Sequence, residues 1–173
     1  AKMLTDTETS HFARYTLEGI GSYAALEAMH DAMGQTSGKL QVGLINSLAN
    51  KVYEPMRDDC VKLLGSDDSA VASAAARALG RLGDADSIAA LMAKKADTTG
   101  QLALDIDLAL LNRAEKLVDN GETDSAMKIH ATMFAPGKPF RLAALRGHML
   151  CQPDKAADLL VEAITPHDLE LAA

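Results

Sequence analysis

The chain has 173 residues, of which 48% are hydrophobic and only 3% aromatic, and its formal net charge is −7. This excess of acidic side chains repels a phosphate backbone at long range, so we expect no nucleic-acid partner. A core of Ala, Leu, Met and Val with so few aromatic residues favours closely packed helices over sheets, and we predict an all-α fold. No run approaches the roughly 18 apolar residues of a membrane span, so we expect no membrane insertion.

Clusters of Gly, Pro, Asp, Ser and Thr divide the chain into short helical segments. Ser22 and Ser69 are the expected N-caps of two of them, because a hydroxyl there can accept a backbone N–H of the first turn. A last helix is expected to begin at His167, after Pro166. In chain order we predict helices at 10–18, 22–33, 39–49, 54–64, 69–82, 84–96, 101–118, 125–134, 140–150 and 154–164.

A leucine recurs every 31 residues, at positions 17, 48, 79 and 110. Such a period is typical of one helical hairpin used repeatedly, with each copy stable only when it is stacked on a neighbour. The next aligned leucine is Leu145, 35 residues after Leu110, so the intervening hairpin is a longer variant. The sequence therefore predicts a repeat array whose repeat length changes after Leu110.

Residues 76–85, Ala-Arg-Ala-Leu-Gly-Arg-Leu-Gly-Asp-Ala, resemble the second helix and following turn of a HEAT repeat of the bacterial, armadillo-like kind. Residues 43–48 and 143–147 resemble degraded copies of that segment. The resemblance implies a right-handed α-α superhelix, or α solenoid, of about five to six HEAT-like hairpins. We interpret residues 1–173 as a single solenoid that is a segment of a longer protein.

Residues 111–121, followed by Ala126, resemble a tetratricopeptide hairpin in their small residues and glycine turn. They lack the Trp of that family. We therefore expect one tetratricopeptide-like hairpin near residues 101–135, where the leucine spacing changes.

In HEAT arrays the second helix of each hairpin lines the concave side. The predicted first helices carry a net charge of −7, summed over residues 22–34, 54–65, 84–97, 122–134 and 153–164. The predicted second helices carry +3, summed over residues 5–18, 38–51, 69–81, 99–119 and 138–150. Acids that favour helix N-termini would make the outer row acidic without any binding role. The alternative is a mildly basic groove for an acidic peptide. Arg77 and Arg81 are its strongest candidates because a guanidinium binds carboxylates in a bidentate manner, although an ordinary solvated helix surface also carries such residues. The candidate partner-binding residues are His11, Tyr15, Asn46, Asn50, Ser73, Arg77 and Arg81.

Signals for catalysis are weak. His11, His30-Asp31 and His167-Asp168 can be aligned with the His…His-Asp series of helical metal phosphohydrolases, but chance supplies such a series easily. The His-Glu pairs of iron-binding HEAT hydroxylases are absent, and few aromatic residues are available to hold a bilin. We expect no enzyme activity, no catalytic residue, no metal and no cofactor. The alternatives are an enzyme-associated HEAT domain, either bilin-lyase-like or a metal-dependent hydrolase, and a structural spacer in a multidomain protein.

The cysteines, Cys60 and Cys151, are too few and too far apart for a disulfide framework, and Cys60 is expected in the core. The function that we predict is non-catalytic protein binding or scaffolding, with a protein or acidic peptide as partner. An incomplete last hairpin predicts either a longer parent protein or an end-to-end homodimer. Because the chain opens as an internal or processed start, a cytoplasmic protein and one exported after removal of an upstream signal peptide both stay open.

Overall fold

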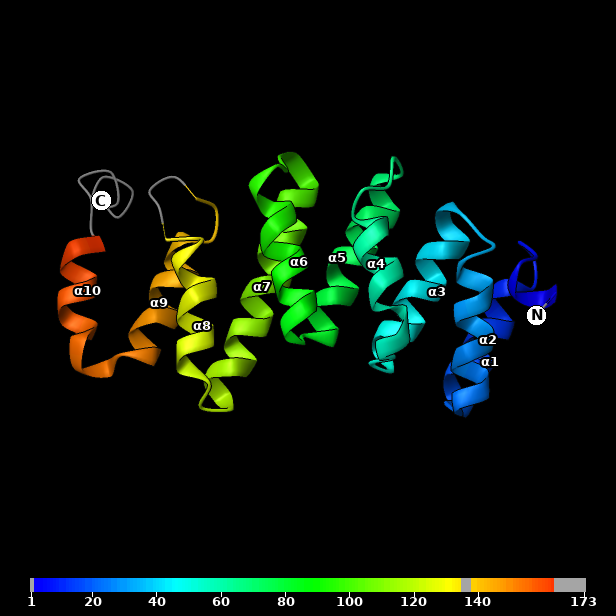
Figure 1. Ribbon diagram of the computed structural model, residues 1–173, viewed down its shortest axis with the longest axis horizontal. Coiled ribbons are helices and arrows are strands. Elements are labelled where there is room, and N and C mark those ends of the chain that lie inside the picture. Colours follow the sequence, from blue (N-terminus) through cyan, green and yellow to red (C-terminus); the bar gives the residue numbers. More distant parts are fainter. Residues whose placement is uncertain (1, 135–137, 164–173) are drawn as a thin grey trace. The chain divides into compact units, whose positions relative to one another are not determined.

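The computed structural model describes residues 2–134 and 138–163, and all regular secondary structure in these ranges is helical (Figure 1). The all-α prediction is confirmed, and the predicted bounds lie within a few residues of the observed ones. The helix expected from His167 lies outside the described residues. The α-helices are α1 (Ser10–Ile20), α2 (Tyr23–Met33), α3 (Gly38–Asn50), α4 (Arg57–Leu63), α5 (Ser69–Leu82), α6 (Ala85–Ala96), α7 (Gly100–Asp119), α8 (Thr123–Ala131), α9 (Arg141–Cys151) and α10 (Ala156–Ala163).

Short 3-10 helices precede three of these elements. They span Lys2–Leu4, Glu54–Met56 and Pro153–Lys155. The one before α4 replaces the first turn that the sequence predicted as α-helix, and Pro55 lies within it. Within the described ranges, every helix is too short or too polar to cross a bilayer.

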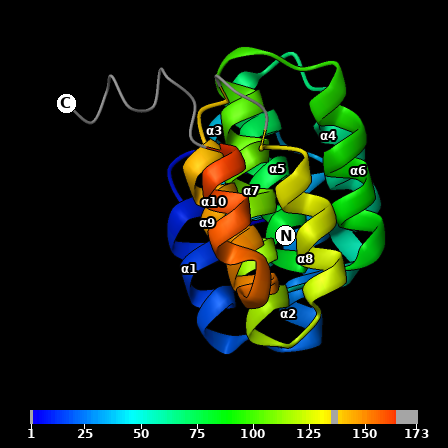
Figure 2. The ribbon, with the colours of Figure 1, turned by 90° about the vertical axis from the view of Figure 1, so that its left-hand side faces the viewer.

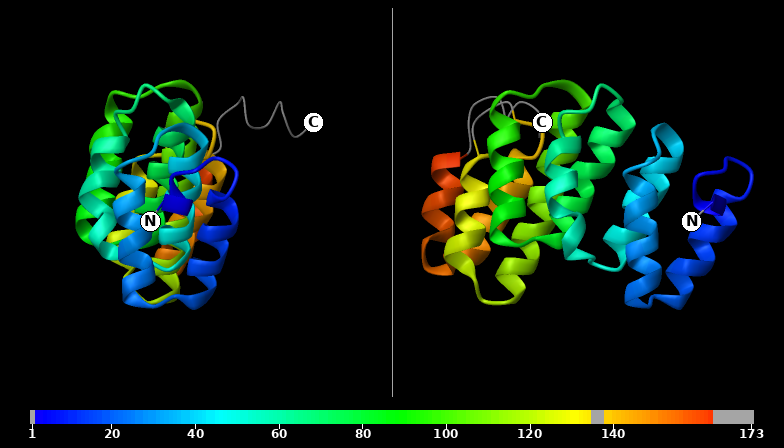
Figure 3. Two further views of the ribbon diagram at one scale, coloured as in Figure 1. Left: turned by 90° about the vertical axis from the view of Figure 1, so that its right-hand side faces the viewer. Right: turned by 45° about the vertical axis from the view of Figure 1, so that its right-hand side comes forward.

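The chain divides into two compact units, Ala1–Ala109 and Leu110–Ala173. In the first unit α1, α3 and α5 pack side by side, and α2, α4 and α6 pack against them. Helices α4 and α6 also contact each other and lie side by side in Figure 2. Figure 3 shows the antiparallel arrangement of α1 and α2 in blue. This stacking of helical hairpins is that of an α solenoid.

The repeated leucines supply the core of the first unit. Leu48 and Leu79 are fully buried, whereas Leu17 in α1 is only half-buried. The first half of α5 is enclosed by its neighbours, since every residue from Val71 to Ala76 is buried. Cys60 is buried as well, which confirms its predicted place in the core. Alanine at most of these positions allows the neighbouring helices to approach closely.

Two predicted helix starts had different outcomes. Ser22 caps α2 as expected, with its hydroxyl accepting a hydrogen bond from the Ala25 backbone N–H at 3.3 Å. The expected cap of α5, Ser69, is instead its first helical residue. Asp68 is the N-cap, because its carboxylate accepts hydrogen bonds from the N–H groups of Ala70 at 2.9 Å and Val71 at 3.4 Å. Both residue types are good caps, and the turn before the helix decided between them.

Replacing Asp68 by alanine is therefore expected to lower the free energy of unfolding by about 1 kcal/mol, because the first turn of α5 loses its side-chain acceptor. Urea unfolding followed by circular dichroism measures the change. The matched control is Ser69→Ala, which removes a hydroxyl that makes no cap and should leave the midpoint nearly unchanged. An equal loss from both substitutions would show that Asp68 is not the functional cap.

In the second unit α9 packs against both α8 and α10. The buried apolar residues of this unit include Ile129 of α8, Met133 just after α8, and Leu145 of α9. Several large apolar side chains stay exposed, among them Leu142 and Val161. Between the helices predicted at 125–134 and 140–150, residues 135–137 lie outside the described residues.

Candidate functional site

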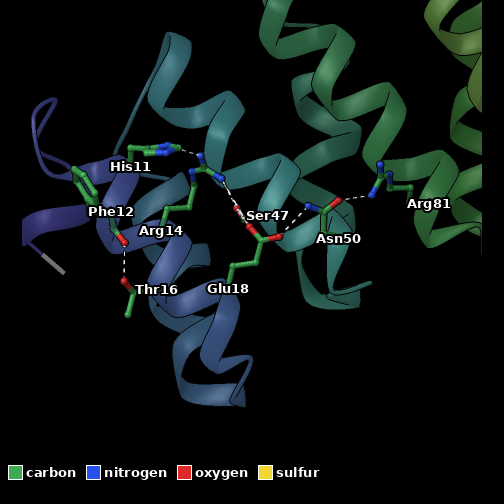
Figure 4. Close-up of polar contacts among 8 residues, drawn as sticks. All are labelled: His11, Phe12, Arg14, Thr16, Glu18, Ser47, Asn50 and Arg81. Atoms are coloured by element: carbon green, nitrogen blue, oxygen red, sulfur yellow. Dashed lines mark hydrogen bonds and ion pairs between the residues drawn. The ribbon is translucent and has the colours of Figure 1, made fainter.

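Five polar side chains link α1, α3 and α5, and we call them the polar network (Figure 4). Glu18 of α1 accepts hydrogen bonds from Ser47 Oγ at 2.5 Å and from Asn50 Nδ2 at 2.9 Å. Arg14 Nη1 donates to Ser47 Oγ at 2.6 Å and lies 3.7 Å from Glu18 Oε2. The network ends on α5, where Arg81 Nη1 donates to the amide oxygen of Asn50. Three successive second helices are thus joined at their surface.

The repeat explains why these residues meet. Asn50 is the last residue of α3 and Arg81 lies next to the end of α5, 31 residues later. They are equivalent positions of consecutive repeats, and neighbouring second helices pack side by side. Equivalent positions therefore face each other across the helix contact. Asn50 and Arg81 were both candidates by helical phase, and the structure brings them together.

Glu18 is the anionic centre of the polar network. Burial alone raises the pKa of its carboxyl, but the hydrogen bonds from Ser47 and Asn50, together with the charges of Arg14 and Lys51, outweigh this effect. The pKa therefore lies below its ordinary value, and the carboxylate is ionised at neutral pH. An ionised Glu18 accepts from the Asn50 NH₂ group, which turns the Asn50 oxygen toward Arg81.

The two arginines of α5 differ in their partners. Arg77 Nη1 lies 3.7 Å from Asp105 Oδ1 of α7, so its charge is balanced within the first unit. Among the described residues Arg81 contacts no carboxylate, and it is exposed to solvent. A guanidinium has five N–H donors, so Arg81 keeps donors for a carboxylate while Asn50 holds one of them.

Exposed aromatic side chains lie beside the polar network on α1. Phe12 and Tyr15 are 73% and 72% exposed. The His11 ring stacks on Tyr15, with ring centroids 6.5 Å apart, and meets the edge of Phe12 at 6.1 Å. Arg14 Nη2 lies 3.0 Å from His11 Nδ1, which connects this aromatic cluster to the network. The surface therefore combines large exposed rings with a solvent-facing guanidinium.

Two other candidates, Ser73 and Asn46, are less exposed than their helical phase predicted. Ser73 is only 8% exposed, because neighbouring helices cover a wider arc of α5 than the apolar stripe indicates. Asn46 is half-buried on α3. Sequence reasoning missed Arg14, Glu18 and Ser47. The i, i+4 spacing of Arg14 and Glu18 was the one local signal that could have singled out two of them.

Of the residues aligned with the metal phosphohydrolases, His30 has a structural partner on a neighbouring helix, and His167 and Asp168 lie outside the described residues. His30 Nε2 lies 2.9 Å from Asp59 Oδ2, which joins α2 to α4, and Asp31 is exposed. Burial, with a smaller contribution from the Asp59 charge, raises the pKa of the Cys60 thiol to about 12, so this thiol stays protonated and is a poor nucleophile. Over residues 2–134 and 138–163, no group of three or more His, Cys, Asp or Glu side chains could hold a metal ion.

A comparison with known families supports the repeat organisation of the first unit. Residues 26–103 match the family model for HEAT repeats, which covers slightly less than half of the chain. No curated protein matches the chain. The tetratricopeptide-like hairpin near residues 101–135 stays a prediction. HEAT repeats generally serve in protein interaction or scaffolding and are typically non-catalytic. Over residues 26–103, the chain is therefore similar to HEAT repeats.

Proposed function

We propose that this chain is a non-catalytic interaction module that binds an acidic segment of a partner protein on the surface formed by α1, α3 and α5. The observation that carries the proposal is the position of Arg81. Its guanidinium is exposed, contacts no described carboxylate, and is held by Asn50, which is itself held by Glu18. A positioned arginine loses less side-chain entropy on binding than a free one, so it is suited to anchor a carboxylate.

The aromatic cluster supplies the second part of the surface. Phe12 and Tyr15 offer large rings on a rigid helix, and aromatic residues and arginine are enriched among the residues that dominate binding energy at protein interfaces. Arg77 is a weaker anchor than Arg81, because a partner carboxylate must compete with Asp105. We therefore expect the partner to place an acidic side chain at Arg81 and apolar side chains against α1.

Replacing Arg81 by glutamate is expected to weaken binding of an acidic probe about tenfold or more, because it removes a charge-assisted contact and adds a repulsive charge. The probe is a fluorescein-labelled oligoglutamate peptide with interspersed leucines, and the readout is fluorescence anisotropy at two salt concentrations. Arg77→Glu should have a smaller effect, since Arg77 already shares its charge with Asp105.

The matched control is Lys128→Glu, which makes the same charge change at an exposed residue of α8. It should bind the probe as the unaltered chain does, apart from a small general effect of charge. Equal weakening by Arg81→Glu and Lys128→Glu would contradict the proposed surface and indicate unspecific attraction. Absence of binding to the unaltered chain would contradict an acidic partner and favour a structural spacer.

A further inference from the structure

The second unit contains a cavity that the proposed interaction surface does not use. Its volume is about 280 Å³, and its walls come from α7, α8 and α9. The α7 residues that line it belong to the part of that helix after Leu110, so the whole cavity lies within one unit. Four of its lining residues are ionisable, namely Glu115, Asp119, His130 and Arg146.

His130 of α8 lines this cavity with unsatisfied polar atoms. The side chain is 0% exposed, and neither Nδ1 nor Nε2 has a hydrogen-bond partner among the described residues. Burial, followed by the charge of His148, lowers the pKa of His130 below its ordinary value, so the ring is neutral at pH 7. A neutral imidazole has one donor and one acceptor nitrogen. Buried polar groups are rarely left unpaired, so the cavity calls for a polar occupant.

Gly147 of α9 makes room for this ring. A Cβ atom at position 147 would lie 2.2 Å from both Cε1 and Nε2 of His130, a distance that no real contact allows. Glycine inside a helix costs about 1 kcal/mol relative to alanine. The close approach of α8 and α9 at this point therefore depends on a residue that is unfavourable for the helix itself, and both Gly147 and the ring line the cavity.

The charged side chains at the cavity are of both signs. Glu115 and Asp119 are four residues apart, so they share one face of α7, and both are exposed. Arg146 comes from α9 and is also exposed. Two carboxylates suit an ammonium group, and a guanidinium suits a carboxylate, which it binds in a bidentate manner. Val118 and Leu150 supply the apolar part of the lining.

We propose that this cavity binds a small zwitterion with one ammonium and one carboxylate group, of the size of an amino acid. The ammonium lies against Glu115 and Asp119 and the carboxylate against Arg146, while the His130 ring closes the buried side of the cavity. The volume fits a ligand of this size, since pockets for larger ligands range over about 300–1,000 Å³. The site is independent of the surface on α1, α3 and α5.

The test titrates the full chain, labelled with ¹⁵N-histidine, with glycine, L-alanine and L-serine. Histidine ring resonances report on His130, and calorimetry measures affinity. We expect a saturable shift of the His130 resonances by at least one of these amino acids. The methyl ester of that amino acid lacks the carboxylate charge and its N-acetyl derivative lacks the ammonium, so neither should shift the resonances at the same concentration.

Arg146→Gln and Glu115→Gln should each weaken binding about tenfold, because each removes a charged partner of the ligand. Both residues are exposed, so the fold should tolerate the change, which circular dichroism checks. The control is Lys116→Gln, at an exposed α7 residue that does not line the cavity, and it should bind normally. Unsaturable or absent shifts would overturn the proposal and leave water as the occupant. Equal binding by Arg146→Gln, Glu115→Gln and Lys116→Gln would overturn it as well.

Discussion

Replacing Leu79 by alanine is expected to lower the free energy of unfolding by about 3 kcal/mol, because the side chain is fully buried and its removal leaves a cavity. Leu79 lies in α5, which packs against α3, α4 and α6. Most of the buried residues of α5 itself are alanines, which are too short to extend into the space that the leucine leaves. Urea unfolding monitored by circular dichroism measures the loss.

Leu17→Ala is the matched control for this substitution, because Leu17 occupies the equivalent repeat position in α1 but is only half-buried. Its expected cost is about 1 kcal/mol, in proportion to the apolar surface that it removes from water. Equal losses at Leu17 and Leu79 would show that the position in the repeat, and not burial, sets the energetic contribution.

Replacing Gly80 by valine is expected to cost about 3 kcal/mol through overpacking. A Cβ atom at position 80 would lie 2.7 Å from the Ala109 Cβ and 3.1 Å from both the Cα and the carbonyl oxygen of Ala109. Two of these three atoms belong to the backbone of α7, so a side-chain rotation cannot relieve the clash. The helices must separate, and they then lose packing along their contact. Thermal unfolding followed by circular dichroism should show a clearly lower midpoint.

Gly19→Val is the control for the clash at Gly80. Gly19 also lies in a helix, α1, and a Cβ atom there would meet nothing within 4 Å. Valine at this site should leave stability unchanged or raise it slightly, since valine is a better helix former than glycine. A loss at Gly19 as large as that at Gly80 would contradict the close approach to Ala109 as the cause.

Most of the fold was predictable from the sequence because its signals are local. The prediction for α5 was residues 69–82, and these are its observed bounds. Helix ends are marked by residues such as Gly21 and Gly83, which adopt positive φ values that glycine tolerates. Where prediction failed, two local signals competed, as at Asp68 and Ser69, and the path of the preceding turn selected the cap.

The candidate surface was only partly predictable, because helical phase gives a direction and not a partner. It placed Asn50 and Arg81 on the same surface, where they meet, but it also placed Ser73 there, which neighbouring helices bury. The contacts of Glu18 with Ser47 and Asn50 join positions 29 and 32 residues apart. Which positions meet depends on how far α1 and α3 are shifted along each other. The sequence of a single helix does not determine that shift.

By itself, the sequence determined that this protein is built of short helices in a 31-residue repeat, since caps, glycines and apolar stripes act within one or two helical turns. Only the tertiary structure decided which polar side chains meet. It placed Arg81 beside Asn50, and it buried His130 against Gly147 with its ring nitrogens unpaired among the described residues. The physical reason is that such contacts depend on the separation and register of packed helices, which are set jointly by all the side chains between them.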